Sequence, residues 1–217
     1  MKKITDYILD LLYPPRCCFC RKVVERDVHG ICSRCREKLP LMKQGKGRRM
    51  IDGGSVCYYP LLYDAMVRES FLRFKFYGAV SYADTYSAIL ADCIRDDPVC
   101  FDIVTWVPIS RRRKKKRGFD QAELLAEGLS SLLGLDCRKI LYKNKETRTQ
   151  SLLKNSDERR RNVKGAYSLC DENTVKGKKI LIIDDIVTTG ATLSECCRVL
   201  KKAGAELVTA AAFASAE

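Results

Sequence analysis

The chain has 217 residues, of which 46% are hydrophobic and 31% are charged. This balance is typical of folded globular proteins and excludes an intrinsically disordered chain. Forty basic and 27 acidic residues give a formal net charge of +13, which favours an anionic partner: nucleic acid, a phosphorylated ligand or an anionic membrane surface.

An amphipathic helix is expected at the N-terminus, where Pro14-Pro15 end it. Its apolar residues at helical spacing are Ile4, Tyr7, Ile8, Leu11 and Leu12. Asp6 and Asp10 interrupt the apolar core that a signal peptide needs, and no apolar run reaches the roughly 18 residues of a spanning helix. We therefore expect a cytoplasmic protein in which the twelve cysteines are reduced thiols or metal ligands.

Four cysteines form two C-x2-C pairs, Cys17 with Cys20 and Cys32 with Cys35, separated by eleven residues. Two such pairs can bring four thiolates together around one Zn²⁺ ion. The alternative, four thiols in a small core, is weaker because residues 16–40 hold too few large apolar side chains to fold unaided. The spacing therefore predicts a closed zinc ribbon, which is structural rather than catalytic.

The other cysteines and the single histidine are expected to lie outside this site. Using Cys18 in place of Cys17 would give C-x-C, a less common spacing, and His29 lies inside the hairpin between the two pairs. The remaining cysteines, expected to be buried and inert, are Cys57, Cys93, Cys100, Cys137, Cys170, Cys196 and Cys197.

The larger domain is expected to follow a linker or exposed loop at residues 41–55, a segment rich in Gly, Lys and Arg without periodicity. We therefore assign residues 1–50 to the helix and ribbon, and 51–217 to the larger domain. In that domain, apolar strands at 56–63, 101–108, 178–184 and 206–213 alternate with helices at 64–76, 81–95, 123–134 and 191–204. This alternation predicts an α/β fold with a parallel, Rossmann-like sheet covered on both faces.

Two basic segments are candidates for binding an anion. Residues 111–117 are seven consecutive cations after a predicted strand, and because they repel one another they are expected to form a loop that is solvated or neutralised by a polyanion. Residues 143–167 are too long and too basic for an ordinary connection, which is typical of a functional lid or a disordered segment.

Residues 180–192 are the clearest functional signal. Asp184 and Asp185 end a predicted strand, and ligands of parallel sheets bind at the carboxyl ends of strands. Gly190 permits a turn whose amides gather at a helix N-terminus, where an anion is stabilised. The hydroxyl donors nearby are Thr188, Thr189 and Thr192. The alternative is a simple helix cap beside an exposed acidic pair. We favour a phosphate in the turn, with the carboxylates facing polyol hydroxyls or Mg²⁺.

This thirteen-residue string resembles the 5-phosphoribosyl-1-pyrophosphate (PRPP) motif of type I phosphoribosyltransferases. It occurs together with VP before the basic run, RGFDQAELLA, RTQSLL and ERRRNVKGAY, all behind YPPRC and the two C-x2-C pairs. In this combination the chain is similar to the ComF family of competence proteins over residues 13–213, with a phosphoribosyltransferase-like fold implied. Two positions depart from the family: Asp120 stands where Asn is usual, and Ser110 where His is common.

The resemblance implies roles for the residues of the site. Asp184 and Asp185 would hold the ribose hydroxyls of PRPP, directly or through hydrated Mg²⁺, and would be the catalytic pair of an active enzyme. The other residues expected to contact PRPP or its phosphates are Thr188, Thr189, Gly190, Ala191, Thr192, Ser110 and Arg117.

Three functions are compatible with this pattern. The leading one is a competence protein for DNA uptake that binds single-stranded DNA and PRPP or a related phosphate, with a competence helicase as partner and Phe119 or Tyr167 stacking on bases. The rival is a Mg²⁺-dependent phosphoribosyltransferase in which Arg117, Arg148 and Arg159 serve pyrophosphate. Against it, the ribbon occupies the stretch where such enzymes build a base-binding hood. In the third, the ribbon docks a protein partner and the larger domain senses PRPP.

Overall fold

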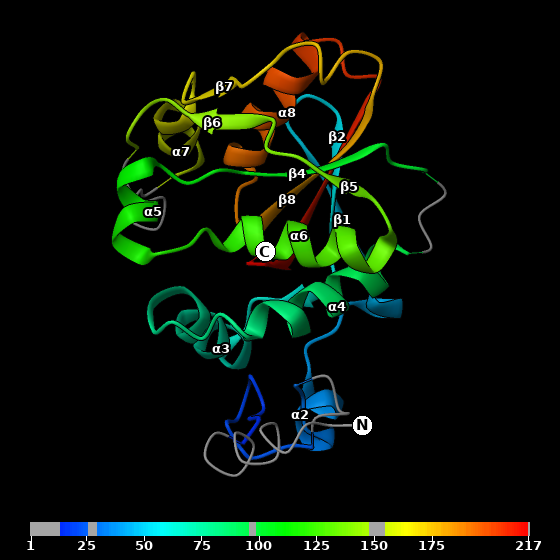
Figure 1. The fold of residues 1–217 in the computed structure, drawn as a ribbon, viewed down its shortest axis with the longest axis vertical. Coiled ribbons are helices and arrows are strands. Elements are labelled where there is room, and N and C mark those ends of the chain that lie inside the picture. The colour runs from blue at the N-terminus through cyan, green and yellow to red at the C-terminus, as the bar shows by residue number, and fades with distance from the viewer. Residues whose placement is uncertain (1–13, 26–29, 96–98, 148–154, 217) are drawn as a thin grey trace, which may run out of the picture.

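The structure, a computed structural model, describes residues 14–25, 30–95, 99–147 and 155–216. The expected N-terminal helix, His29 and the RTQSLL motif lie outside these residues. The described part of the chain forms an α/β domain with a small cysteine-bearing unit at one end (Figure 1). Within it, no helix combines the length and the apolarity needed to cross a bilayer.

A mostly parallel sheet forms the centre of the larger domain. Its strands are β1 (Gly47–Ile51), β2 (Ser55–Tyr59), β3 (Leu61–Leu62), β4 (Ile103–Trp106), β5 (Asp136–Cys137), β8 (Lys179–Val187) and β9 (Leu207–Ser215). The order is β1-β2-β9-β8-β4-β5, with β3 also beside β9, and every pair is parallel except β1 with β2. The predicted parallel α/β sheet is confirmed, and β8 lies inside it between β9 and β4.

Helices cover both faces of this sheet (Figure 1). They are α3 (Ala65–Phe76), α4 (Tyr82–Ile94), α6 (Gln121–Leu133), α7 (Ser156–Val163) and α8 (Ala191–Lys202). A further helix, α5 (Arg111–Arg117), contributes no buried residue to either core. On one face α3, α4 and α6 share a core in which Tyr86 and Leu125 are fully buried. On the other face α7 and α8 pack beside a hairpin of β6 (Leu141–Lys143) and β7 (Tyr167–Leu169). The helices predicted around α3, α4, α6 and α8 are confirmed.

The cysteine-bearing unit docks on α3 and α4 (Figure 1). Ser70 Oγ donates a hydrogen bond of 2.6 Å to the carbonyl of Cys18. Arg73 Nη2 donates to the carbonyls of Cys18 and Phe19 at 2.9 and 2.6 Å. The ring of Phe19 lies 6.3 Å, centroid to centroid, from the ring of Tyr86 on α4. Helix α3 therefore fastens the small unit to the larger domain.

The segment expected to be a linker is structured instead. It holds a 3-10 turn, η2 (Lys43–Gly45), followed by β1 and the start of β2, which pair as an antiparallel hairpin. A Cβ at Gly47 would lie 2.4 Å from Tyr59 Cε2, so the strands close only with glycine there. Strand β1 also spans the predicted boundary between residues 50 and 51. The linker prediction was wrong because β2 is held by the distant strand β9, a contact that local composition does not encode.

The basic run, expected to be a loop, is helix α5. Ser110 Oγ accepts the N–H of Arg113 at 3.4 Å as the N-cap, and Gly118 ends the helix with a φ of 89°. Lysine and arginine are good helix formers, and capping satisfies groups at both ends. Lys114 is also ion-paired with Glu123 of α6. The loop prediction was wrong because these contacts outweigh the repulsion between neighbouring cations.

Candidate functional site

Four cysteine thiols come together in the small unit. Cys32 precedes and Cys35 lies within α2 (Ser33–Lys38), and their Sγ atoms and those of Cys17 and Cys20 all lie within 4.8 Å of one another. Cys20 Sγ and Cys32 Sγ are 3.6 Å apart. This is close to the ~3.8 Å edge of a tetrahedron with Zn–S bonds of about 2.3 Å. The four thiols therefore fit one structural zinc ion, as their spacing predicts.

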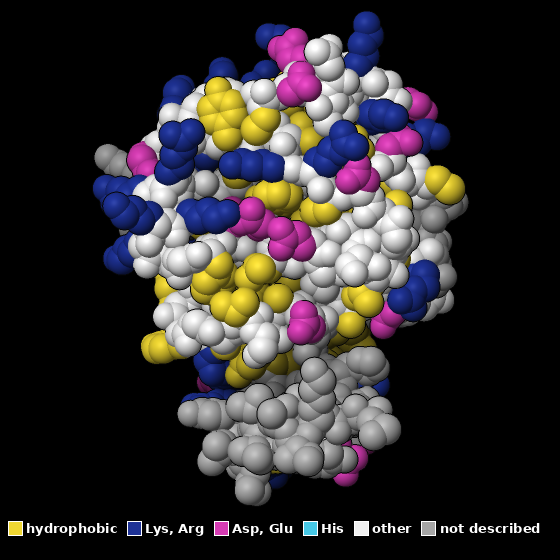
Figure 2. All heavy atoms as spheres, in the orientation of Figure 1, with side chains coloured by type: hydrophobic (Ala, Val, Ile, Leu, Met, Phe, Trp, Pro, Cys, Tyr) yellow, Lys and Arg dark blue, Asp and Glu magenta, His cyan; other side chains and the backbone are white. Residues whose placement is uncertain are grey.

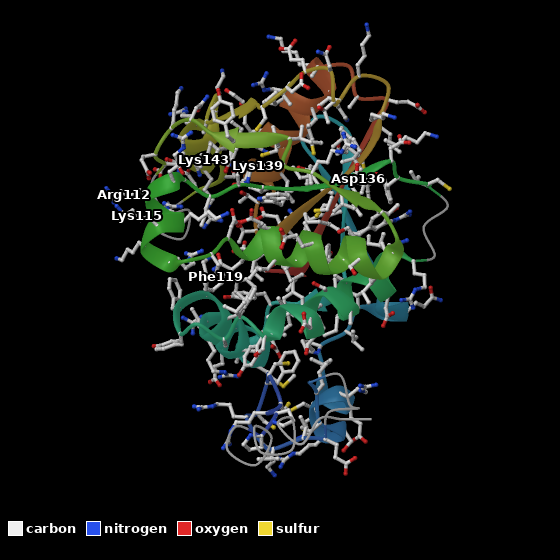
Figure 3. The ribbon with its side chains drawn as sticks, in the orientation of Figure 1. Arg112, Lys115, Phe119, Asp136, Lys139 and Lys143 are labelled. Atoms are coloured by element: carbon white, nitrogen blue, oxygen red, sulfur yellow. The ribbon has the colours of Figure 1, made fainter. Side chains whose placement is uncertain are left out.

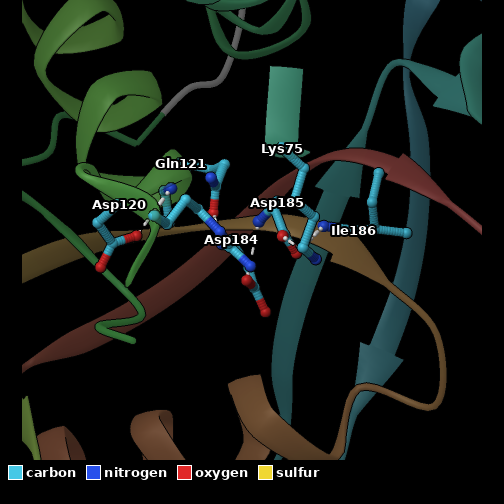
Figure 4. Close-up of polar contacts among 8 residues, drawn as sticks. Lys75, Asp120, Gln121, Asp184, Asp185 and Ile186 are labelled. Atoms are coloured by element: carbon cyan, nitrogen blue, oxygen red, sulfur yellow. Dashed lines mark hydrogen bonds and ion pairs between the residues drawn. The ribbon is translucent and has the colours of Figure 1, made fainter. Parts of the chain in front are cut away.

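The two carboxylates lie where β8 runs past its neighbour β4. Strand β4 pairs with β8 only as far as Ile183, whereas β9 pairs with β8 as far as Val187. Asp184 and Asp185 are therefore inside β8, with the edge that faces β4 left open, rather than at its last residues as expected (Figure 4). Because successive residues of a strand point to opposite faces, one carboxylate is directed towards α3 and the other towards α8.

Asp185 is ion-paired with Lys75 of α3 (Figure 4). Lys75 Nζ lies 3.1 Å from Asp185 Oδ2, and the two side chains are 30% and 22% exposed. The N–H of Ile186 donates to Asp185 Oδ1 at 2.6 Å. Burial alone would raise the pKa of Asp185, but Lys75, this N–H and the Arg117 guanidinium outweigh it and hold the pKa below its usual value. Asp185 is therefore ionised at neutral pH.

Asp184 is the weaker acid of the pair. Burial and the adjacent charge of Asp185 raise the pKa of Asp184 well above its usual value, although the N–H of Asp185 donates to Asp184 Oδ1 at 2.8 Å. Two buried carboxylates on adjacent residues repel each other, so they do not both ionise easily. A cation or a pair of hydroxyl donors at the open edge of β8 would relieve this repulsion.

The turn after β8 holds an unsatisfied hydroxyl and a glycine with left-handed geometry. Arg49 Nη1 of β1 donates to the carbonyl of Thr188 at 2.6 Å, which ties the turn to the hairpin. Gly190 has a φ of 75° at the N-cap of α8, and a Cβ there would lie 2.8 Å from Ile51 Cγ2. Thr189 Oγ1 is buried without a hydrogen-bond partner in the described residues. A buried orphan hydroxyl is costly, and an oxyanion in the turn would satisfy it.

The other residues predicted to bind PRPP lie at the start of α8 and at the two ends of α5. Ala191 and Thr192 begin α8, directly after the turn. Arg117 ends α5 and lies close enough to the carboxylates to lower the pKa of Asp185, with its guanidinium 5.5 Å from the ring centroid of Phe76. Ser110 is buried, and its hydroxyl caps α5. The fold thus brings Arg117 to the carboxylate pair, while the Ser110 hydroxyl is engaged in capping.

Asp120, where the sequence departs from the ComF pattern, begins α6. Its Oδ1 accepts the N–H of Ala122 at 3.1 Å, and its Oδ2 accepts the N–H of Ile109 at 2.9 Å. The side chain is buried. Burial, helped by the negative charges of Glu123 and Asp185, raises the pKa of Asp120 to about 6, although the N–H of Ile109 acts in the opposite direction. The carboxyl therefore joins the segment that follows β4 to the first turn of α6.

Replacing Asp120 with Asn is expected to change how stability depends on pH. Folding raises this pKa from 3.8 to about 6, so the contribution of the carboxyl is greatest below about pH 4 and is lost as the pH rises through about 6. The free energy of unfolding of the wild type, relative to Asp120→Asn, should fall by about 2–3 kcal/mol between about pH 4 and pH 7. Urea unfolding at several pH values measures this difference. A difference that is constant with pH, or that grows, would contradict it.

Two basic cavities flank α5. The larger, about 710 Å³, lies between the end of α3 and α5, and the smaller, about 340 Å³, lies between α5 and β6. The larger is lined mainly by Lys75, Phe76, Arg112, Lys116, Arg117 and Phe119. The smaller is lined mainly by Arg111, Lys139, Tyr142 and Lys143. Lys and Arg side chains gather on this face beside a few carboxylates (Figure 2), and the labelled cations come from α5 and from the region of β6 (Figure 3).

Only one of the two aromatic residues predicted to stack on bases is available. Phe119 lines the larger cavity, with its ring 5.8 Å from that of Phe74. Tyr167 is 4% exposed in β7, and its hydroxyl accepts a hydrogen bond of 3.2 Å from Lys143. The prediction for Tyr167 was therefore wrong, because its ring belongs to the core under β7. Arg159 is half-buried on α7, and Arg148 lies outside the described residues.

Two cations at the site, Lys75 and Arg49, were not predicted from the sequence. Lys75 contacts Asp185, and Arg49 holds the turn through Thr188. The available signal for Lys75 was weak: a lysine between two phenylalanines at the end of a correctly predicted helix. Arg49 lay in the segment interpreted as a linker, so nothing pointed to it. Both residues make contacts across the sheet that a local pattern does not contain.

Comparison with known proteins agrees with this arrangement. The sequence model of the phosphoribosyl transferase domain family matches residues 115–217, and that of the double zinc ribbon domain matches residues 8–46. The described part of the ribbon brings together four thiols, enough for one zinc ion.

Three curated proteins are similar to the chain. Competence protein F of Haemophilus influenzae is 33% identical over 141 residues, which cover 62% of this chain and 61% of that protein. The DNA utilization protein YhgH of Escherichia coli O157:H7 is 38% identical over 110 residues, 49% of this chain and 46% of that protein. Competence protein ComFC of Bacillus subtilis is 28% identical over 217 residues, which cover 94% of this chain and 75% of that protein. The chain thus spans less than two thirds of the first two proteins.

Proposed function

Because the chain belongs to the ComF family of competence proteins, we propose that it serves DNA uptake in the cytoplasm by binding single-stranded DNA and PRPP or a related phosphate. The names of its relatives, two competence proteins and a DNA utilization protein, support the DNA role. The net charge of +13 and the basic helix α5 favour binding to a polyanion.

One observation carries the PRPP part of the proposal: the unsatisfied Thr189 hydroxyl in a glycine turn, just beyond a carboxylate pair on the same strand. The turn offers hydroxyl and amide donors to a phosphate at the N-terminus of α8. Asp184 and Asp185 offer acceptors to the ribose hydroxyls. A sugar phosphate would therefore find hydrogen-bond donors for its phosphate in the turn and acceptors for its hydroxyls at the carboxylate pair.

Mg²⁺ fits this site only together with a ligand. Two carboxylates are too few for a cage of protein ligands, and Mg²⁺ is usually held by one or two carboxylates, several waters and substrate phosphates. Asp185 is ionised and partly exposed, which suits such a role. The ion would supply positive charge to the phosphates of PRPP. Lys75 and Arg117 already place fixed positive charge beside the same carboxylate.

Calorimetric titration with PRPP plus Mg²⁺, in parallel with single-stranded DNA, tests the proposal on wild type and on Asp184→Asn/Asp185→Asn. We expect the double variant to bind PRPP about 100-fold more weakly, since the hydrogen bonds from the ribose hydroxyls to the two carboxyl groups are weakened. Binding of DNA should be retained and should weaken as salt is raised, because phosphate contacts release counterions.

The outcomes separate the functions. A wild type that binds neither PRPP nor single-stranded DNA at low salt would refute the proposal. Release of pyrophosphate from PRPP in the presence of a nucleobase, lost in Asp184→Asn/Asp185→Asn, would make the protein an active phosphoribosyltransferase instead. The charge that Lys75 and Arg117 bring to Asp185 is the observation that favours testing this activity, because cations at that place would neutralise a leaving pyrophosphate.

A further inference from the structure

The larger cavity has the size and lining of a ligand site. Its volume of about 710 Å³ lies within the range of roughly 300–1,000 Å³ typical of small-molecule sites. Lys75 lines it and also lies 3.1 Å from Asp185, so the cavity adjoins the carboxylate pair. It is thus a neighbour of the proposed PRPP site, separate from the turn that holds Thr189.

Two cations in this cavity lack partners. Arg112 and Lys116 are one turn apart on α5 and both line the cavity, and the side chain of neither makes a hydrogen bond or ion pair with any described residue. The neighbouring cations differ: Arg113 donates to the carbonyl of Thr147 at 2.7 Å, and Arg117 donates to Gln121. Like charges one turn apart on a helix repel. An anion between Arg112 and Lys116 would remove that repulsion.

An exposed aromatic surface borders the same cavity. Phe76 is 62% exposed, and the adjacent Tyr77 is 80% exposed. The Arg117 guanidinium lies 5.5 Å from the ring centroid of Phe76, and Phe119 also lines the cavity. Exposed rings of this size next to unpaired cations match the two parts of a nucleotide, a flat base and a phosphate.

We propose that the larger cavity receives one unstacked nucleotide of a single DNA strand, with its phosphate between Arg112 and Lys116 and its base on Phe76. This rests on the proposed function and names the place where the strand is held. A strand fits better than a free nucleotide because the unpaired cations continue past the cavity, through Lys115 to Lys139 at the smaller cavity (Figure 3). A single nucleotide is too short to occupy both cavities, which lie on opposite sides of α5, whereas a strand can contact both.

Matched variants test this assignment. Phe76→Ala removes the ring from the larger cavity, and its control Tyr142→Ala removes an exposed ring from the smaller one. Arg112→Ala/Lys116→Ala removes the unpaired cations of the cavity, and its control Arg111→Ala/Lys115→Ala removes the same charge from the same helix. The probe is a short thymidine oligonucleotide with one internal 2-aminopurine, whose emission changes when the base leaves its neighbours. A duplex and 2-aminopurine deoxyribonucleoside monophosphate are compared with it.

We expect Phe76→Ala to weaken binding of the oligonucleotide by roughly five- to 100-fold and to abolish the change in 2-aminopurine emission. Tyr142→Ala should keep the emission change. Arg112→Ala/Lys116→Ala should make the dependence of log K on log salt less steep by about 0.7, since the one strand phosphate held between these residues loses its cations, and Arg111→Ala/Lys115→Ala by about 0.7–1.4. Only Arg112→Ala/Lys116→Ala should also lose the emission change. The duplex and the mononucleotide should bind much more weakly than the strand.

Three results would overturn the assignment. One is a Phe76→Ala protein that binds the strand as tightly as wild type. Another is equal loss of the emission change in both double variants, which would mean diffuse attraction to α5. The third is a mononucleotide that binds as tightly as the strand, which would make the cavity a site for a free nucleotide. If wild type binds no strand at low salt, the proposed function fails as well, so the two failures are distinguishable.

Discussion

Removing zinc from the four-cysteine site, by chelation or by Cys17→Ser/Cys20→Ser, is expected to unfold the ribbon. Structural zinc contributes apparent binding energies of about 10–16 kcal/mol in small metal-binding units, comparable with or greater than the total stability of a domain. The described part of the ribbon has a small apolar core of its own, in which the large buried apolar residues are Phe19, Val24 and Ile31. Loss of the metal should also lower the melting temperature of the larger domain, because Phe19 packs against Tyr86.

Zinc content and two optical signals measure this outcome. Wild type should hold one zinc ion per chain and the double variant none, while Cys100→Ser/Cys170→Ser, which changes two exposed cysteines outside the cluster, should keep it. Trp106, the single tryptophan, is buried at the end of β4 and reports on the larger domain. Its emission should change at a lower temperature in the double variant than in wild type, and the far-ultraviolet circular dichroism of the chain should lose the small contribution of the ribbon. Full zinc retention by Cys17→Ser/Cys20→Ser would contradict the assignment.

The features that the sequence predicted correctly are those determined by residues close together in the chain. The two C-x2-C pairs determine which thiols can meet, and the structure brings together the four predicted. The apolar run before Asp184 and the glycine turn after it lie within thirteen residues, so strand, turn and helix follow from one another. The long helices carry their own periodicity and caps, as with Asp64, which caps α3 by accepting the N–H of Val67.

The features that sequence missed depend on contacts far apart in the chain. The ion pair of Lys75 with Asp185 joins residues 110 positions apart, and the hydrogen bond from Arg49 to Thr188 joins residues 139 apart. Neither residue belongs to a recognisable motif. The hairpin of β1 and β2 was interpreted as a linker for the same reason, since its Gly and Arg content gives no periodic signal. The candidate site is thus completed by residues from the N-terminal part of the chain.

This arrangement links the zinc ribbon to the carboxylate pair through one helix. On α3, Ser70 and Arg73 hold the ribbon backbone at Cys18 and Phe19, and Lys75, half a turn later, holds Asp185. A helix transmits displacement along its axis because its backbone hydrogen bonds keep it rigid. The ribbon therefore stabilises the helix that positions a cation at the site.

Replacing Gly190 with Ala is expected to destabilise the fold and to disrupt the phosphate turn. The left-handed φ of 75° costs about 1–2 kcal/mol for a residue with a side chain, and the new Cβ would lie 2.8 Å from Ile51 Cγ2. Relieving such an overlap in a packed site costs about 1–3 kcal/mol more. Gly134→Ala is the matched control, because Gly134 has a similar φ of 68° but open space around the added Cβ.

The difference between the two variants isolates the contact with Ile51. We expect urea unfolding to show a loss of about 2–5 kcal/mol of unfolding free energy for Gly190→Ala and of about 1–2 kcal/mol for Gly134→Ala. Ile51→Ala combined with Gly190→Ala should be less destabilising than the two changes added together, since the small side chain makes room for the new methyl group. Affinity for PRPP should fall in Gly190→Ala and should be unchanged in Gly134→Ala, because only the change at Gly190 moves the amides and the Thr189 hydroxyl of the turn. Equal stability of the two glycine variants would contradict the close contact with Ile51. Unchanged PRPP affinity in Gly190→Ala would contradict phosphate binding in the turn.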